Sequence, residues 1–165
     1  MLANEFDDVA QLGDVLRRSG DTVAVAESCT GGLLGAVLTE LPGSSDYMRG
    51  GVIAYADDVK ADLLGVSRHE LALHGAVSEP VARAMASGVR MRCGASVGIG
   101  ITGVAGPGAS AGKPAGLIFV AVRTASDSRV SRLTEDRGRE ANRTGAVRAA
   151  LRLCLELVGQ PPPTG

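Results

Sequence analysis

The sequence predicts an α/β fold of three layers, in which a mixed, mostly parallel sheet of about five strands carries helices on both faces. Two observations lead to this class. Short apolar segments alternate with helical patterns through the first hundred residues, as in right-handed βαβ units. The last two strand candidates are joined through the short segment TASDS, which favours an antiparallel hairpin and makes the sheet mixed.

Length and composition favour one domain. A chain of 165 residues can bury one substantial core, and nothing in its length requires a second. Hydrophobic residues make up 45% of the chain, but it has two Phe, two Tyr and no Trp, so Ala, Val, Leu and Ile must build the core. We expect a single domain over residues 1–165, with a frayed tail from about residue 159, where GQPPPTG begins.

Periodicity and stop signals define the first elements. Residues 5–18 carry an apolar stripe at helical spacing and are followed by Gly20, so they predict a helix. DTVAVA, residues 21–26, predicts a short buried strand because its valines favour strands and turn residues flank it. GLLGAVLTEL, from residue 32, predicts a second helix, and GGVIAYA, residues 50–56, predicts the second strand.

Three helices are expected before the next strand. Residues 57–65 predict the first, with Asp57 or Asp58 as its N-cap. Ser67 could cap a brief second helix, and Ser78 opens a longer third one whose apolar residues have the spacing of a helix packed on a sheet.

The second half of the chain predicts three strands and a long helix. The strands are expected over residues 95–102, 116–123 and 128–136, and the helix over roughly residues 142–158. The connection GVAGPGASAGKPAG, between the first two of these strands, is too rich in Gly and Pro to be regular.

Two unusual loops point to the position of a site. ESCTGG and TGVAGPG each follow a strand that is expected to be parallel. Open α/β sheets bind ligands beyond the carboxyl ends of their parallel strands. We therefore expect both loops to lie on the same edge of the sheet.

Charge and cysteine usage argue against several classes of protein. A net charge of −1 and the lack of an aromatic platform argue against a nucleic-acid partner. No apolar stretch is long enough to span a bilayer, and the N-terminus is acidic where a signal peptide would be basic. Three cysteines without CxxC spacing support neither a disulfide framework nor a metal site. We expect a cytoplasmic protein with reduced thiols, no metal and no cofactor.

Ser28 is the first candidate for chemistry. A serine beside a helix N-terminus has amide donors nearby that could stabilise an oxyanion, and Gly31 and Gly32 let a ligand approach the backbone. The alternative is an ordinary helix cap, a role that Thr30 could fill instead. Cys29 is either a rival nucleophile or a small buried side chain.

A serine nucleophile needs a base. Of the 17 basic residues only Lys60 and Lys113 are lysines, and an amine, unlike a guanidinium, can lose its proton. Lys60 is the preferred base if it is desolvated, and a solvated helix residue otherwise. His69 and His74 belong to a short helical pattern that favours a surface or structural role. Tyr55, at a strand end, could polarise either partner or pack in the core.

Two further segments carry weaker signals. TGVAGPG is neither a Walker A loop nor a GxGxxG motif before a helix, although its backbone amides could form an anion nest. EDRGRE offers Arg137 and Arg139 near the end of the last strand, and each is more often a surface residue than a phosphate clamp.

Together these segments resemble the CinA C-terminal domain family, whose enzymatic members are nicotinamide mononucleotide deamidases. The resemblance covers residues 21–157, nearly the whole chain. The separate N-terminal domain of longer members is absent from the sequence, so the resemblance implies a stand-alone deamidase. The matching segments, in chain order, are AESCTGGLLGAVLTELPGSSDYMRGGVIAYADDVKADLLGV, GAVSEPVARAMASGVR, ITGVAGPG, KPAGLIFVAV and DRGRE.

The resemblance implies hydrolysis of the carboxamide of nicotinamide mononucleotide to nicotinate mononucleotide and ammonia, in pyridine nucleotide salvage, by a homo-oligomer that needs no metal. Carried onto this chain, Ser28 is the nucleophile and Lys60 its base. Tyr55 matches the tyrosine that precedes the lysine helix of the family. The amides of SCTGG would hold the oxyanion. Substrate contacts would come from Thr30, Gly31 and Gly32.

The substrate's ribose and phosphate would contact a second set of residues. Thr102, Gly103 and Gly106 match the second loop of the family, and Arg137 matches the arginine after its last strand. The chain departs from the family at two places near them. ASAGK follows AGPG where further glycines are usual, and the acidic Glu135 stands where a glycine is usual. Both departures concern phosphate contacts rather than the core chemistry.

A non-catalytic alternative has the same fold. The chain could be a nucleotide-binding module, or a partner subunit, that performs no turnover. The presence of Ser28, Tyr55 and Lys60 together favours the enzyme.

Overall fold

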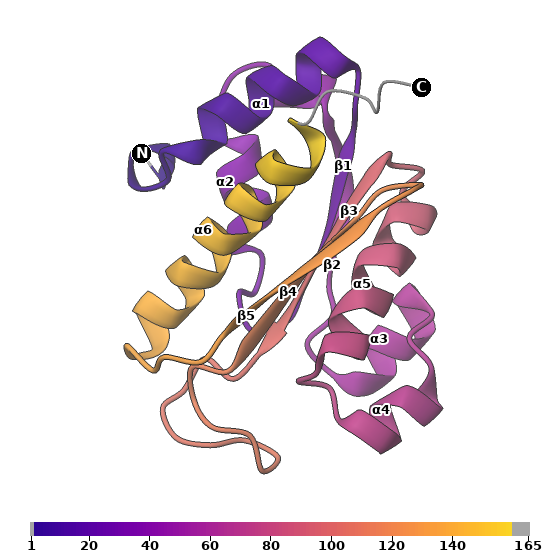
Figure 1. The fold of residues 1–165 in the computed structure, drawn as a ribbon, viewed down its shortest axis with the longest axis vertical. Helices are drawn as coiled ribbons and strands as arrows, with labels where there is room; N and C mark the ends of the chain where they lie inside the picture. The colour runs from indigo at the N-terminus through magenta and orange to yellow at the C-terminus, as the bar shows by residue number, and fades with distance from the viewer. Residues whose placement is uncertain (1, 160–165) are drawn as a thin grey trace.

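A computed structural model describes residues 2–159 and has the predicted α/β fold (Figure 1). Residues 160–165, which belong to the predicted frayed tail, lie outside the described residues. None of the described helices has both the length and the apolar character needed to cross a membrane. The elements are a 3-10 helix (Leu2–Glu5), α1 (Asp8–Ser19), β1 (Val23–Glu27), α2 (Leu33–Thr39), a 3-10 helix (Ser44–Asp46), β2 (Met48–Ile53), α3 (Asp57–Leu64), α4 (Arg68–His74), α5 (Glu79–Arg92), β3 (Val97–Gly103), β4 (Ile118–Arg123), β5 (Ser128–Leu133) and α6 (Arg139–Val158).

The five-stranded sheet has the order β2-β1-β3-β4-β5. β1 pairs in parallel with both β2 and β3, whereas β3 with β4 and β4 with β5 are antiparallel. The predicted mixed sheet and closing hairpin are therefore confirmed. Helices α1, α2 and α6 lie on one side of the sheet, and α3, α4 and α5 on the other (Figure 1).

Alternation along β1 divides the core between the two faces of the sheet. Val23 and Val25 belong to the cluster that includes the apolar residues of α1, α2 and α6. Ala24 and Ala26 belong to the cluster formed with α3 and α5. Because successive side chains of a strand point to opposite faces, one face carries larger side chains and the other carries small ones.

The small-residue face lets α5 approach β3 closely. A Cβ on Gly98 would lie 2.0 Å from the Ala86 carbonyl oxygen, and one on Gly100 would lie 2.5 Å from the Ala82 carbonyl oxygen. The backbone of α5 therefore rests on the backbone of β3, which only glycine permits. This contact fixes the N-terminus of α5 relative to the carboxyl end of β3.

Some predicted boundaries were wrong. The N-cap of α3 is Ala56, without a side-chain hydrogen bond, so neither Asp57 nor Asp58 caps it. Helix α6 begins at Arg139 instead of residue 142, and the Asn142 amide donates to the Gly138 carbonyl at 2.8 Å in its first turn. Propensity patterns define helix interiors better than their ends.

Candidate active site

A cavity of about 380 Å³ opens beyond the carboxyl ends of β1 and β3. The predicted meeting of ESCTGG and TGVAGPG at one edge is confirmed, since both contribute to its wall. Two segments contribute to its wall: the Ser28 turn (residues 28–32), through Ser28 and Cys29, and the β3–β4 loop (residues 104–117). The lining residues are Ser28, Cys29, Tyr55, Asp57, Lys60, Gly75, Ala76, Val77, Thr102, Gly103, Val104, Ala105, Gly106, Pro107, Gly108, Ala109, Ser110, Ala111, Lys113 and Arg139.

Ser28 and Lys60 meet inside this cavity. The Lys60 Nζ lies 3.3 Å from the Ser28 Oγ and donates to the Tyr55 carbonyl oxygen at 3.0 Å. Ser28 follows β1, whereas Lys60 lies in the first turn of α3, so two neighbouring strand ends bring the pair together. Only 1% of Lys60 is exposed, which is rare for a lysine.

Burial lowers the pKa of Lys60 below its usual 10.5. The nearby carboxylate of Asp57 acts in the opposite direction, but its Oδ1 lies 3.9 Å away and its side chain is exposed. Water weakens such an interaction, so desolvation dominates. A neutral amine can accept a proton from the serine hydroxyl, so this pair is suited to nucleophilic catalysis.

Cys29 has the environment of an unreactive thiol. Burial is the main cause that raises its pKa, to about 11, and the charge of Glu27 adds to the effect. A thiol with this pKa stays protonated at neutral pH, although it lies on the cavity wall. The cavity therefore favours Ser28 over Cys29 as nucleophile.

Glu27 has a role that the sequence did not reveal. This last residue of β1 is 1% exposed. Its Oε2 accepts from the amides of Gly32 and Leu34 at 3.1 Å each, and its Oε1 accepts from the Gly35 amide at 2.8 Å. Glu27 thus satisfies the first amides of α2, whose N-cap has no side-chain bond of its own. The cap that was expected from Ser28 or Thr30 comes from Glu27 instead.

The amides of the Ser28 turn are partly occupied. The Ser28 amide donates to the Ile101 carbonyl at 3.0 Å, the Gly31 amide to the Ser28 carbonyl at 3.1 Å, and the Gly32 amide to Glu27. Gly31 and Gly32, with φ of 60° and 97°, adopt the left-handed conformation that favours glycine. Within residues 2–159, the amides of Cys29 and Thr30 have no oxygen acceptor.

The Thr30 side chain does not line the cavity. It is completely buried, is not among the lining residues, and its Oγ1 has no hydrogen-bond partner in the described part of the chain. Gly31 and Gly32 also lie outside the lining set. None of these three predicted substrate contacts therefore lines the cavity, although all three belong to the Ser28 turn.

The residues predicted in the second loop do line the cavity. The Thr102 Oγ1 donates to the Ala76 carbonyl at 2.8 Å, which ties β3 to the segment before α5. Gly103 is required by packing, because a Cβ there would lie 2.6 Å from the Ile118 Cγ1. Gly106 has a φ of 87°, and its carbonyl accepts from the Arg139 Nη1 at 2.6 Å.

Arg137 is not brought to this cavity. Its exposed guanidinium pairs with Glu135, with 3.0 Å between Nε and Oε2, and it borders separate hollows. The arginine on the cavity wall is Arg139, and Lys113 lies on the same wall. The sequence offered both Arg137 and Arg139, and the family resemblance favoured Arg137, whereas the structure brings Arg139, the first residue of α6, to the cavity.

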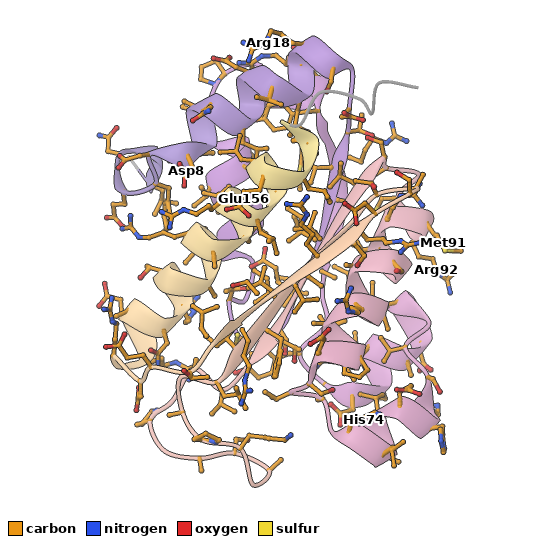
Figure 2. The ribbon with its side chains drawn as sticks, in the orientation of Figure 1. Asp8, Arg18, His74, Met91, Arg92 and Glu156 are labelled. Atoms are coloured by element: carbon orange, nitrogen blue, oxygen red, sulfur yellow. The ribbon has the colours of Figure 1, made fainter. Side chains whose placement is uncertain are left out.

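Within residues 2–159, the Tyr55 hydroxyl and the two histidines make no hydrogen bond to Ser28 or Lys60. The Tyr55 side chain is 61% exposed on the cavity wall, so it is not in the core, and its carbonyl oxygen, not its hydroxyl, meets Lys60. His69 and His74 lie on α4 outside the lining set, and the His74 Nε2 is 3.4 Å from Glu70 (Figure 2). No cluster of three potential metal-ligating side chains occurs within residues 2–159.

The first turns of α6 reach both cavity loops. The Asn142 Nδ2 donates to the Ala105 carbonyl at 3.0 Å and to the Asp136 Oδ1 at 2.9 Å. The Arg143 Nη2 donates to the Thr30 carbonyl at 2.8 Å. Helical periodicity identifies the buried stripe of α6 but not the polar side chains at its start, so sequence reasoning missed both residues.

Comparisons with known proteins place this geometry in a family. The chain is 51% identical over 142 residues to a CinA-like protein of Gloeobacter violaceus, covering 84% of this chain and 33% of the relative. It is 48% identical over 143 residues to a putative competence-damage inducible protein of Desulforudis audaxviator, covering 86% and 35%. The chain thus spans about a third of the length of these relatives.

Solved structures have the same fold over nearly the whole chain. The competence/damage inducible protein CihA from Agrobacterium tumefaciens superposes with a TM-score of 0.84 at 38% identity, covering 93% of this chain and 96% of that one. A competence-damaged protein (CinA) superfamily protein from Klebsiella pneumoniae superposes with a TM-score of 0.89 at 31% identity, with the same coverage. A family model described as the CinA C-terminal domain matches residues 7–158, and the chain belongs to that family.

Proposed function

We propose that this chain is an amidohydrolase that converts nicotinamide mononucleotide and water to nicotinate mononucleotide and ammonia. One observation carries the proposal: the Lys60 Nζ lies 3.3 Å from the Ser28 Oγ, and both side chains are buried on the wall of one cavity. A buried amine next to a serine hydroxyl is the arrangement of a general base and its nucleophile. The resemblance of the surrounding motifs to the deamidases supplies the substrate class.

In the first step, Ser28 attacks the carboxamide carbon. The neutral Lys60 amine takes the hydroxyl proton while the Oγ–C bond forms, and the carbonyl oxygen becomes an oxyanion. The same proton passes from Lys60 to the amide nitrogen, the C–N bond breaks, and ammonia leaves an acyl ester on Ser28. The cationic pyridinium ring withdraws electrons from the carbonyl and so favours the attack.

Water then hydrolyses the acyl ester, with Lys60 again first accepting and then returning a proton. Lys60 takes a proton from the water molecule as its oxygen bonds to the acyl carbon. The ester bond then breaks, and Lys60 returns the proton to the Ser28 Oγ. The product is the carboxylic acid, and both groups regain their starting protonation.

The oxyanion needs hydrogen-bond donors. The Cys29 amide is the candidate, because Cys29 lines the cavity, whereas Thr30 is fully buried outside the lining and the other amides of the Ser28 turn donate within the protein. An amide that immediately follows the nucleophile is well placed for this role. Loss of one such donor typically costs about 10²–10³ in kcat.

The rest of the cavity suits a phosphorylated pyridinium nucleotide. Arg139 and Lys113 place two cationic side chains on the β3–β4 side of the wall, where they can bind a phosphate. The exposed ring of Tyr55 offers a face to the cationic pyridinium. A volume of about 380 Å³ falls within the usual range for small-molecule sites.

The test is ammonia release from nicotinamide, its riboside and its mononucleotide, measured with the wild type and the variants Ser28→Ala, Cys29→Ala and Lys60→Met. We expect release from the mononucleotide, a loss of at least about 10³-fold in kcat for Ser28→Ala and Lys60→Met, and activity within a few-fold of wild type for Cys29→Ala.

Other outcomes identify other functions. Full activity of Ser28→Ala would exclude the serine mechanism, and loss of activity in Cys29→Ala alone would replace it with a thiol mechanism. Calorimetric binding of the mononucleotide by the wild type, with no ammonia formed over hours, would identify a nucleotide-binding module.

A further inference from the structure

We infer that Glu27 and Arg143 are positioning residues that hold the Ser28 turn so that the serine hydroxyl faces Lys60. The inference rests on the proposed serine hydrolase and extends it to two residues that do not line the cavity. Both are charged, and both act on the backbone around Ser28 from outside the site. Glu27 does so from the end of β1, and Arg143 from α6.

Glu27 fixes the exit of the turn. Its carboxylate accepts the amides of Gly32, Leu34 and Gly35, within 3.1 Å in each case. No ion pair compensates this buried carboxylate within residues 2–159, so backbone amides alone stabilise it there. Burying a carboxylate in this way is costly unless its bonds are kept, and they are kept only if the turn retains its conformation.

Arg143 fixes the middle of the turn. Its Nη2 donates to the Thr30 carbonyl at 2.8 Å, a charge-assisted hydrogen bond between residues 113 positions apart in the chain. The adjacent Gly31 has a left-handed φ, and a Cβ on it would lie 3.8 Å from the Arg143 Nη2. The guanidinium therefore lies directly against the turn and ties it to α6.

The catalytic distance leaves little tolerance. At 3.3 Å, the separation of the Lys60 Nζ and the Ser28 Oγ is already at the long end of hydrogen-bond distances. Lys60 is held independently of the Ser28 turn by its bond to the Tyr55 carbonyl. A shift of the turn by about 1 Å would therefore separate the pair, and such displacements can reduce rates about 10²-fold.

The first experiment compares Arg143→Met and Arg143→Lys with the control Arg152→Met, which removes an exposed arginine elsewhere on α6. For Arg143→Met we expect kcat to fall about 10- to 100-fold while KM for the mononucleotide changes by less than about 3-fold. Arg143→Lys keeps a cationic donor and should recover part of kcat, and Arg152→Met should match the wild type.

The second experiment compares Glu27→Gln with Glu156→Gln, an exposed position on α6 (Figure 2). Both carboxylate oxygens of Glu27 accept backbone amides, but glutamine has only one acceptor oxygen. Its NH₂ group would therefore face an amide donor, and at least one of these hydrogen bonds would be lost. We expect a loss in kcat similar to that of Arg143→Met, and no change for Glu156→Gln. Circular dichroism and thermal melting verify folding, and if Glu27→Gln does not fold, the Arg143 variants alone decide the inference.

A serine-directed phosphonate separates this inference from the proposed function. Its rate of attachment to Ser28, measured by peptide mass, reports the dyad without any nucleotide. Slower labelling in folded Arg143→Met, with recovery in Arg143→Lys, supports positioning even if the wild type releases no ammonia, an outcome that would count only against the substrate. Wild-type labelling and kcat in folded Arg143→Met would overturn the inference.

Discussion

The two segments that face each other across the cavity are built differently. Residues 28–30 of the Ser28 turn are buried, and the side chains of Glu27 and Arg143 hold the turn. The β3–β4 loop has an exposed tip that is closed mainly by its own backbone, with Ser110 and Lys113 exchanging two hydrogen bonds of 2.9 Å. Side chains of α6 bond the start of this loop at Ala105 and Gly106 but not its tip. Contacts with other elements fix a geometry more firmly than hydrogen bonds within a loop tip do.

This difference assigns separate tasks to the two segments. Nucleophilic attack requires a position accurate to a fraction of an ångström, so it belongs on the held turn. Binding of a phosphate by long cationic side chains tolerates more movement, so it belongs on the loop. Changes near the turn should therefore alter kcat, and changes on the loop should alter KM. The predictions below test that division, starting with the largest expected effect.

Lys60→Met should abolish catalysis but stabilise the fold. Burial lowers the pKa of Lys60 in the folded protein, so the unfolded chain binds more protons between that pKa and 10.5. Wild-type stability therefore rises with pH across this window, and the penalty is largest below it. Methionine removes the penalty, and we expect a Tm at pH 7 higher by roughly 2–4 °C for each kcal/mol recovered.

Melting curves at several pH values check this sign. The advantage of Lys60→Met should shrink as the pH rises towards and past 10.5, because Lys60 is neutral in both states only above that value. In the wild type, kcat/KM should rise with pH through the pKa of the free enzyme's Lys60. A Lys60→Met protein less stable than the wild type at pH 7 would show that the lysine is not desolvated.

Arg139→Met and Lys113→Met should weaken binding of the phosphate. For each, we expect KM for the mononucleotide to rise about 10-fold, with kcat within about 3-fold of wild type, because removal of uniform binding leaves the chemical step intact. The riboside, which lacks the phosphate, is the internal control, and its kcat/KM should not change. Arg137→Met is the matched protein control, since Arg137 pairs with Glu135 outside the cavity. If kcat/KM fell equally for the mononucleotide and the riboside, the phosphate would not bind to this part of the cavity wall.

Ala111→Gly should have the smallest effect. Ala111 has a φ of 48° in the tip of the β3–β4 loop, a left-handed conformation that costs an L-residue about 1–2 kcal/mol. Glycine removes this strain but increases the entropy of the unfolded chain by a comparable amount, so we expect Tm to rise by at most about 2 °C. Kinetic constants should stay within 2-fold of wild type, and a large fall in kcat would show that the tip takes part in the chemistry.

The sequence predicted the fold well because its signals are local. Valines between turn residues identified β1, a short connection identified the closing hairpin, and glycines marked helix ends. For the site, the scarcity of lysine favoured Lys60 as the base but left a solvated helix residue as the alternative, and the resemblance to the CinA C-terminal domain family supplied its pairing with Ser28. Their 3.3 Å separation agrees with the predicted pairing.

The residues that hold the site could not be read in the same way. Glu27 ends an apolar strand, and nothing local indicates that its carboxylate accepts amides up to eight residues later. Arg143 acts on Thr30, 113 positions away, through a contact that exists only after α6 docks on the sheet. Local sequence did not separate Arg137 from Arg139, because the start of α6 at Gly138, which determines which of them reaches the cavity, depends on backbone hydrogen bonds rather than on apolar periodicity.

The direct contact between α5 and β3 has a wider consequence. Even one methyl group at Gly98 or Gly100 would collide with the backbone of α5, so the helix would have to lift from the sheet. The segment 75–77, which precedes α5 and forms part of the cavity wall, would move with it. In a survey of random variants, substitution of either buried glycine should therefore reduce activity as severely as substitution of the reacting groups, although neither glycine contacts the substrate.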